Sequence, residues 1–489
     1  MRRSKFSLSH TKLFSCDMGE LIPMGLFEVL PGDSIQQASN LLVRASPLLA
    51  PVMHPVDVRV HHWYVPYRLM WDDFEDFITG GPDGMDASQY PTKGAVGTIG
   101  SLDDYLGLPL HSGAGYLVSA FPYRAYALIF NEFYRDQDLQ TALPLSTAGG
   151  LDATTNVTLQ NVGWEKDYFT SARPWEQKGP AITIPLGTTA PVNRTGTNPS
   201  LVRIASTGAL PGALVDPVKA AATGQLETPA GTDLQLDPNG ALIADLSSAS
   251  AITINLLREA LALQRFEEAR ARFGSRYVEY LRYLGVRSSD ARLQRPEYLG
   301  GGRQTMSFSE VLQTAEGTDP VGALKGHGIA GVRSNRYRRY FEEHGLVMSL
   351  LSIRPKTIYM QGLSRMWNRR TKEDFWQKEL EGIGQQAILN KEVYVNHTTP
   401  EGTFGYQDRY DEYRRQESSV AGEFRTSTLN HWHMAREFAS DPALNATFVK
   451  SVPTERTFAV PSEDVIYVYA RHSIQARRLV AQTGKSFVY

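Results

Sequence analysis

Arginines alternate with aromatic residues in three stretches of the chain, a combination that suits contact with a nucleic acid. The stretches are residues 333–340, 365–372 and 409–415. Arginine and lysine neutralise phosphates, and aromatic rings stack on unpaired bases. Together with the basic N-terminus they supply the candidate nucleic-acid-facing residues Arg2, Arg3, Lys5, Arg336, Arg338, Arg339, Arg369 and Arg370. The alternative is that these cations form salt bridges with the 52 acidic residues, within one chain or between chains.

Two glycine-rich motifs match cofactor sites only in part. Residues 326–331 follow the pattern G-x-G-x-x-G, but a dinucleotide site needs a hydrophobic strand before it and an apolar helix after it. The highly charged stretch 332–340 follows instead, so we expect a glycine turn. Residues 484–486 match the end of a P-loop, yet Leu479 stands where its first glycine belongs. We therefore expect no cofactor.

Histidines, cysteine and paired acids give no convincing metal or catalytic site. His61 and His62 are adjacent on an expected strand and point to opposite faces, so they cannot easily bind one ion. His431 and His433 could share a face, but no cysteine or acid stands at ligand spacing beside them. The single cysteine, Cys16, excludes disulfides within the chain. We expect no metal-binding residue.

Two pairs of adjacent acids raise the question of a glycosidase. Asp72 with Asp73 and Asp103 with Asp104 could supply two carboxylates across a cleft. Acids on a helix surface or at a helix cap explain both pairs more simply, so we expect no catalytic residue and no enzyme. The open alternative from another class is a carbohydrate-active enzyme.

Composition limits the other functional classes. The 489 residues are 42% hydrophobic and 10% aromatic, enough for a large core, and the net charge is -2. A near-neutral chain has no global field that draws it to nucleic acid or membrane, so polyanion binding must come from local patches. No run of eighteen apolar residues occurs, so we expect no membrane insertion.

Strand patterns lie far apart along the chain. Residues 56–66 alternate between two faces, and an amphipathic helix follows until Gly80. Further strands are expected at 346–355, 357–360, 458–460 and 465–469. Long excursions separate these strands, which favours an antiparallel all-β sandwich with helical and loop insertions over a βαβ series.

Composition also divides the chain. Residues 1–54 contain turn signals with little periodicity and are expected to form an extended N-terminal arm. No aromatic residue occurs between Trp175 and Phe266, so we interpret 178–250 as a surface insertion with too little apolar area for its own core. A helix is expected from Asn255 to about Gly274. The sandwich would then comprise 55–177 and 251–489.

Several segments in one consistent order extend across both sides of this insertion. They are residues 55–71, 122–126 with 131–137, 167–178, 290–301, 382–387 with 390–392, and 404–406 with 422–425. Together they resemble the major capsid protein of the gokushoviruses, small single-stranded DNA bacteriophages of the Microviridae. Two places depart from that pattern: 178–250, and the C-terminus, where an Arg-Pro-x-Pro style ending would be expected.

The resemblance implies an eight-stranded viral jelly roll with large insertions, self-assembled into a T=1 icosahedral shell. The shell would enclose circular single-stranded DNA, be built with a scaffolding protein, carry a DNA pilot protein and assemble in the bacterial host cytoplasm. It also implies that 178–250 forms a variable protrusion near the threefold axis, which would suit contact with a host receptor. A third alternative is a monomeric single-strand-binding protein with strongly salt-dependent binding and no shell.

Overall fold

The computed structural model describes residues 3–83, 85–111, 115–180, 254–273, 294–315, 317 and 320–482, with short pieces between 182 and 244. The chain forms two compact units, Gly179–Glu267 and the remainder. Among the described residues, no helix is long and apolar enough to cross a membrane.

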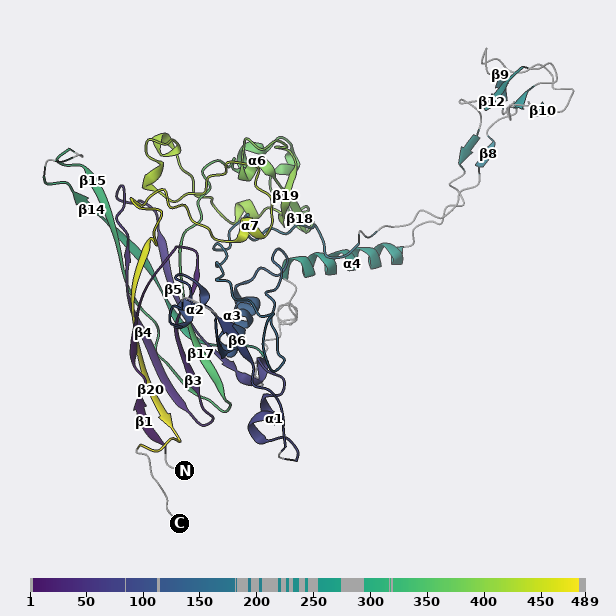
Figure 1. Ribbon diagram of the computed structural model, residues 1–489. Helices are drawn as coiled ribbons and strands as arrows, with labels where there is room; N and C mark the ends of the chain where they lie inside the picture. Colours follow the sequence, from purple (N-terminus) through teal and green to yellow (C-terminus); the bar gives the residue numbers. More distant parts are fainter. Residues whose placement is uncertain are drawn as a thin grey trace. The chain divides into compact units, whose positions relative to one another are not determined.

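One curled antiparallel sheet dominates the larger unit (Figure 1). Its order is β1-β20-β4-β15-β14-β5-β17-β3, with β16 paired to β4 and β2 paired to β20. The strands are β1 (Ser4–Ser7), β2 (His10–Cys16), β3 (Leu21–Val29), β4 (Ser34–Ala45), β5 (Val56–Pro66), β14 (Glu297–Leu312), β15 (Leu324–Arg333), β16 (Tyr337–Tyr340), β17 (Gly345–Pro355) and β20 (Ile466–Arg478). This architecture confirms the expected all-β jelly roll with insertions.

The period of two in β5 determines which residues enter the sandwich. Val56, Val58 and Val60 are fully buried in its interior, where they pack with residues of β4, β15, β17 and β20. The alternate residues face the outside of the sandwich, and two of them, Trp63 and Val65, join a second apolar cluster. The strand pattern expected at 56–66 is therefore confirmed.

A helical segment covers the outer face of β5, β17 and β3. Its helices are η1 (Tyr67–Leu69), α1 (Phe74–Thr79), α2 (Leu102–Leu106), α3 (Phe121–Ile129) and η2 (Phe130–Tyr134). Trp71 and Tyr126 are fully buried there against Met348 of β17. Gly80 ends α1 with φ 87°, and its N–H donates to Asp76 O at 2.8 Å. Figure 1 shows α2 and α3 beside β17 and β3.

A buried polar layer links the two halves of the sandwich. His62 Nδ1 lies 2.8 Å from Ser349 Oγ, and its Nε2 lies 3.1 Å from Ser334 Oγ. Ser334 Oγ also accepts from the Ser39 N–H at 2.8 Å, and Ser39 Oγ lies 2.8 Å from His472 Nδ1. Both imidazole rings are fully buried. These bonds join β4, β5, β17 and β20 and replace the water that the polar groups lose on folding.

The expected extended arm differs from the structure. Residues 1–54 contain β1 to β4, and β4 is a central strand of the sheet. Its periodicity is weak because the inward-facing Gln37 and Ser39 are polar and belong to the buried layer. The strands expected at 357–360 and 458–460 are reduced to isolated bridges of Tyr359 with Arg436 and of Phe458 with Leu48.

Residues 356–464 are mainly loops around a third apolar cluster that includes Tyr168, Phe404 and Phe448. Its short elements are η4 (Arg365–Asn368), η5 (Lys372–Asp374), β18 (Gln385–Leu389), α6 (Asn390–Val393), β19 (Thr403–Asp408), η6 (Asp411–Tyr413), η7 (Gly422–Arg425), η8 (Asn430–Trp432) and α7 (Ala446–Val449). Elsewhere β6 (Thr92–Ala95) pairs with β7 (Tyr116–Ser119).

The smaller unit contains nested antiparallel ladders. β8 (Val192–Arg194) pairs with β13 (Leu242–Ala244), β9 (Val202–Ile204) with β12 (Leu234–Leu236), and β10 (Lys219–Ala220) with β11 (Leu226–Glu227). The helix expected from Asn255 is α4 (Ile254–Phe273).

Candidate nucleic-acid interface

Half of the large sheet has an outer face that the helical segment does not cover. In β20 every second residue points to the core, and Tyr467, Tyr469, Arg471, Gln475 and Arg477 point away from it. β4 and β15 alternate in the same way. Antiparallel partners lie on the same side of a sheet, so β1, β2, β4, β15, β16 and β20 share one outer surface.

The outward residues of these strands include no aspartate or glutamate. We call this outer surface the basic face. Its cations, including Arg3 just before β1, are Arg3, Lys5, Arg44, Lys325, Arg333, Arg338, Arg471 and Arg477. Its aromatic residues are Tyr340, Tyr467 and Tyr469. The near-neutral chain therefore concentrates positive charge on one sheet surface.

The strand register brings several of these cations into one hollow. Lys5 lies opposite Arg477, Arg477 opposite Ser34, and Ser34 opposite Tyr340. The Arg3 guanidinium carbon lies 5.0 Å from the centre of the Tyr340 ring. Arg3, Lys5, Ser34, Arg338 and Arg477 line a hollow of about 390 Å³.

A second group of cations lies further along the same strands. Arg471 is opposite Asn40, and Asn40 is opposite Arg333. Arg471 and Arg477 are separated by about 20 Å at the usual rise of a strand. Among the residues that the structure describes, Arg338, Arg471 and Arg477 have no carboxylate oxygen within 4.0 Å. Like charges on neighbouring strands repel one another, so a polyanion from outside the chain would reduce this electrostatic repulsion.

The structure separates the candidates that the sequence grouped. Arg3, Lys5 and Arg338 meet at the hollow, and Arg336 is exposed in the connection between β15 and β16. Arg339 lies apart from them, because its Nη2 is 3.0 Å from Glu297 Oε1. Arg2 lies outside the described residues.

Arg369 and Arg370 belong to the loop region and not to the basic face. The Arg369 guanidinium stacks 4.4 Å from the centre of the Tyr413 ring, and its Nη2 lies 3.8 Å from Glu412. Arg370 Nη1 donates to the carbonyl oxygens of Trp367 and Arg369. For Arg339 and Arg369 the salt-bridge alternative therefore describes the contacts that are present.

Several residues of the basic face were missed from the sequence. They are Arg44, Lys325, Arg471 and Arg477, while Arg333 lies in the stretch 333–340 but is not among the candidates drawn from it. For Arg471 and Arg477 the available signal is the alternation of polar and apolar residues along 466–478, which indicates a strand with a polar outer surface. A search for dense basic stretches does not detect this spacing.

The motifs rejected as cofactor and metal sites have structural roles. The glycines of 326–331 lie within β15, not in the expected turn. A Cβ on Gly326 would approach Ala50 O to 2.5 Å. His61 and His62 do face opposite sides of β5. Among the described residues, no group of three or more His, Cys, Asp or Glu side chains could hold a metal ion.

Comparison with known proteins decides between the functional classes. The family model described as "Capsid protein (F protein)" matches residues 1–487. The chain belongs to this capsid protein family. It is a structural protein of the virion capsid, and the family excludes the alternative of a carbohydrate-active enzyme.

Individual relatives support the same assignment. Capsid protein VP1 of Bdellovibrio phage phiMH2K is 37% identical over 484 residues, covering 94% of this chain and 90% of the relative. Capsid protein VP1 of Chlamydia phage 1 is 34% identical over 547 residues, with 95% and 92% covered. That of Spiroplasma virus 4 is 32% identical over 502 residues, with 94% and 90% covered. The resemblance to gokushovirus capsid proteins is confirmed, and self-assembly into a shell follows from the family.

Proposed function

We propose that this capsid protein forms a T=1 icosahedral shell around a circular single-stranded DNA genome and turns its basic face towards that DNA. The acid-free surface of β1, β2, β4, β15, β16 and β20 carries the proposal, since its arginines suit phosphates and its tyrosines suit unpaired bases. In the same proposal, the shell assembles in the bacterial host cytoplasm with a scaffolding protein and carries a DNA pilot protein.

Removing positive charge from the basic face should weaken DNA binding. In Arg471→Gln with Arg477→Gln, two phosphate contacts are lost while β20 keeps its inward residues. The slope of log affinity against log salt is negative, and each lost contact to single-stranded DNA should reduce its magnitude by roughly 0.7. For an oligothymidine we expect the magnitude of the slope to fall by about 1.4. We also expect particles to contain less DNA per protein.

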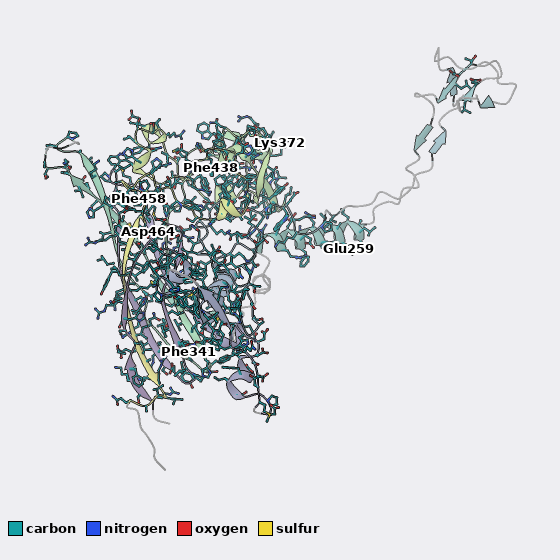
Figure 2. All side chains as sticks on the ribbon, viewed as in Figure 1. Glu259, Phe341, Lys372, Phe438, Phe458 and Asp464 are labelled. Carbon is teal, nitrogen blue, oxygen red and sulfur yellow. The ribbon has the colours of Figure 1, made fainter. Side chains whose placement is uncertain are left out.

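A matched control removes two cations elsewhere. Arg370 is exposed, and the Lys372 side chain is 87% exposed. Phe341 marks the position of the basic-face strands, because it packs in the core with Ile35 and Ala476 of those strands. Figure 2 shows Lys372 at the opposite end of the unit from Phe341. Arg370→Gln with Lys372→Gln should leave the salt slope unchanged. A fall in the control, with no change in the basic-face variant, would place the DNA on the loop region instead.

We also propose that the insertion 178–250 is the variable protrusion and the host-contacting part of the protein. Gly179–Glu267 forms a compact unit of its own, so its removal leaves the core of the sandwich complete. Joining Lys178 to residue 251 should give shells without projections and abolish adsorption to host cells. Electron microscopy of the particles checks the first result and an adsorption assay the second. Unchanged adsorption would assign host contact to another surface.

A further inference from the structure

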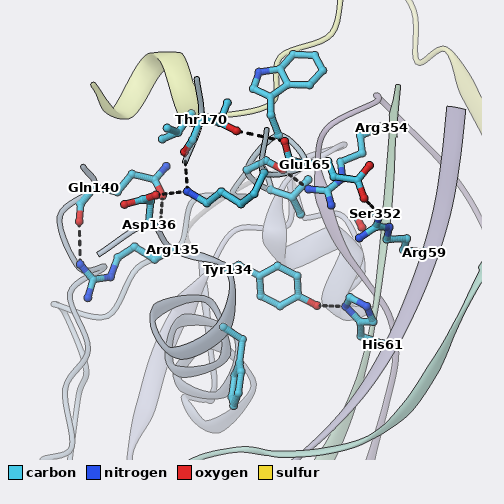
Figure 3. Close-up of a pocket in the computed structure, with 16 residues that line it drawn as sticks. Arg59, His61, Tyr134, Arg135, Asp136, Gln140, Glu165, Thr170, Ser352 and Arg354 are labelled. Carbon is cyan, nitrogen blue, oxygen red and sulfur yellow. Dashed lines mark hydrogen bonds and ion pairs between the residues drawn. The ribbon is translucent and has the colours of Figure 1, made fainter. Parts of the chain in front are cut away.

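A second positively charged site lies away from the basic face. It is a cavity of about 390 Å³ between the outer surface of β5 and β17 and the loops that follow η2 (Figure 3). Arg59 and Arg354 line it from the strands. Tyr134 lines it from η2, and Arg135 and Glu165 line it from the loops that follow η2.

The sheet register places the two strand arginines on the same side. Arg59 of β5 pairs with Ser352 of β17, and Asp57 pairs with Arg354. The intervening residues, Val58 and Ile353, are buried inside the sandwich. Arg59, Ser352 and Arg354 must therefore face the cavity side, where the helical segment limits their access to water.

Carboxylates balance only part of the positive charge. Arg59 Nη2 lies 2.7 Å from Glu165 Oε1, and Lys166 pairs with Asp136. His61, which also lines the cavity, is neutral near pH 7 because burial and the neighbouring Arg59 and Arg354 lower its pKa to about 4.

Arg135 and Arg354 are the two cavity-lining cations that form no salt bridge with a described residue. Among the described residues, neither has a carboxylate oxygen within 4.0 Å. Arg354 donates to Gly163 O and Arg135 to Gln140 O, while the Nε of each has no hydrogen-bond partner. Arg59 Nε is likewise without a partner.

This excess charge is costly for the isolated protein. Burial, with Arg59 beside it, lowers the pKa of Arg354 to about 10, so the guanidinium stays protonated at neutral pH. A half-buried cation with no carboxylate oxygen within salt-bridge distance destabilises the folded chain. Arg59 and Arg354 lie on the same side of the sheet and line one cavity, and their guanidinium groups suit a ligand that carries several acceptor oxygens.

We propose that this cavity binds a phosphate-type oxyanion, held mainly by Arg354 and Arg59 beside the hydroxyl of Ser352. Arg135 lines the same cavity and adds a further positive charge. The same chemistry is offered by inorganic phosphate and by a phosphodiester of a nucleic acid. The site is separate from the basic face, because its residues project from strands and loops under the helical segment.

The test uses the full chain in phosphate-free buffer and measures the thermal unfolding midpoint. Inorganic phosphate should raise the midpoint by several degrees relative to chloride at equal ionic strength, since a ligand of the folded state stabilises it. A short oligothymidine forms the second arm. A shift with phosphate means that the free ion suffices. A shift with the oligothymidine alone means that the site takes a phosphodiester only if that shift is lost in Arg354→Met and kept in Arg471→Gln with Arg477→Gln.

Arg354→Met is the decisive variant. It removes a half-buried charge that has no salt-bridge partner, so its midpoint without ligand should equal or exceed that of the unaltered protein. The phosphate-induced shift should disappear. Arg456→Met is the matched control, because Arg456 Nη1 lies 2.9 Å from Glu437. That variant should be less stable and keep the shift.

Two results would overturn the proposal. One is the absence of any shift with both phosphate and oligothymidine, and the other is a phosphate-induced shift that is as large in Arg354→Met as in the unaltered protein. Arg471→Gln with Arg477→Gln should retain the phosphate shift. The result with phosphate is therefore independent of whether the basic face binds DNA.

Discussion

Asp152→Ala should lower the free energy of unfolding of the capsid protein by about 3–5 kcal/mol, because it leaves the buried Arg124 guanidinium without its anion. Both side chains of this pair are 0% exposed, and Arg124 Nε lies 2.9 Å from Asp152 Oδ2. Arg124 also donates to Met70 O and to Ala148 O, each at 2.7 Å. The pair thus connects α3 to Met70, which directly follows η1, and to the loop at Ala148.

Further donors hold the same carboxylate. Burial acts to raise the pKa of Asp152, but hydrogen bonds from Thr155 and Arg124 outweigh it and lower the pKa to about 2. Chemical denaturation of the unassembled chain at neutral pH measures the loss. Asp152→Asn keeps a hydrogen-bond acceptor and should cost less than the alanine.

A double substitution separates the loss of the pair from the loss of volume. Replacing both residues with apolar side chains, as in Arg124→Met with Asp152→Leu, removes both charges together. It should be markedly more stable than Asp152→Ala, because no charge is then buried alone. Equal stability of Asp152→Ala and the unaltered protein would show that the ion pair contributes little.

The buried polar layer should make the sandwich sensitive to acid. Burial, followed by the charges of His472 and His61, lowers the pKa of His62 to about 3. Burial and the charge of His10 lower the pKa of His472 to about 4. In the unfolded chain both groups take up a proton near the ordinary value of 6.5.

The sign of the effect follows from these values. Both histidines are neutral in the folded protein, so their contribution to stability is complete above pH 6.5 and decreases as the pH falls towards their folded pKa values. At about pH 5 each histidine should destabilise the fold by about 2 kcal/mol relative to neutral pH. The carboxyls of Glu20 and Glu417 act in the opposite direction, because burial raises the pKa of each to about 7.

The difference between the protein and a variant isolates the histidine. His62→Gln should lose stability at neutral pH but should lose about 2 kcal/mol less than the unaltered protein between about pH 7.5 and 5. Denaturant unfolding at the two pH values measures this difference. Parallel pH profiles for the two proteins would show that His62 is not the titrating group.

The sequence alone determined the features that depend on local pattern. The alternation in 56–66 predicted β5 because each inward valine is apolar and each neighbour faces the other way. The absence of aromatic residues between Trp175 and Phe266 predicted a segment separate from the core, and Gly179–Glu267 is a compact unit of its own. The spaced segments shared with gokushovirus capsid proteins indicated the family.

The tertiary structure decided what depends on strand pairing. β4 was not expected, because Gln37 and Ser39 become acceptable core residues only when partners from other strands satisfy them. The basic face has the same origin, since Lys5 and Arg477 are distant in sequence and become neighbours only when β1 pairs with β20. A linear chain does not specify which distant strands pair, so the gathering of charge on one surface appears only in the folded sheet.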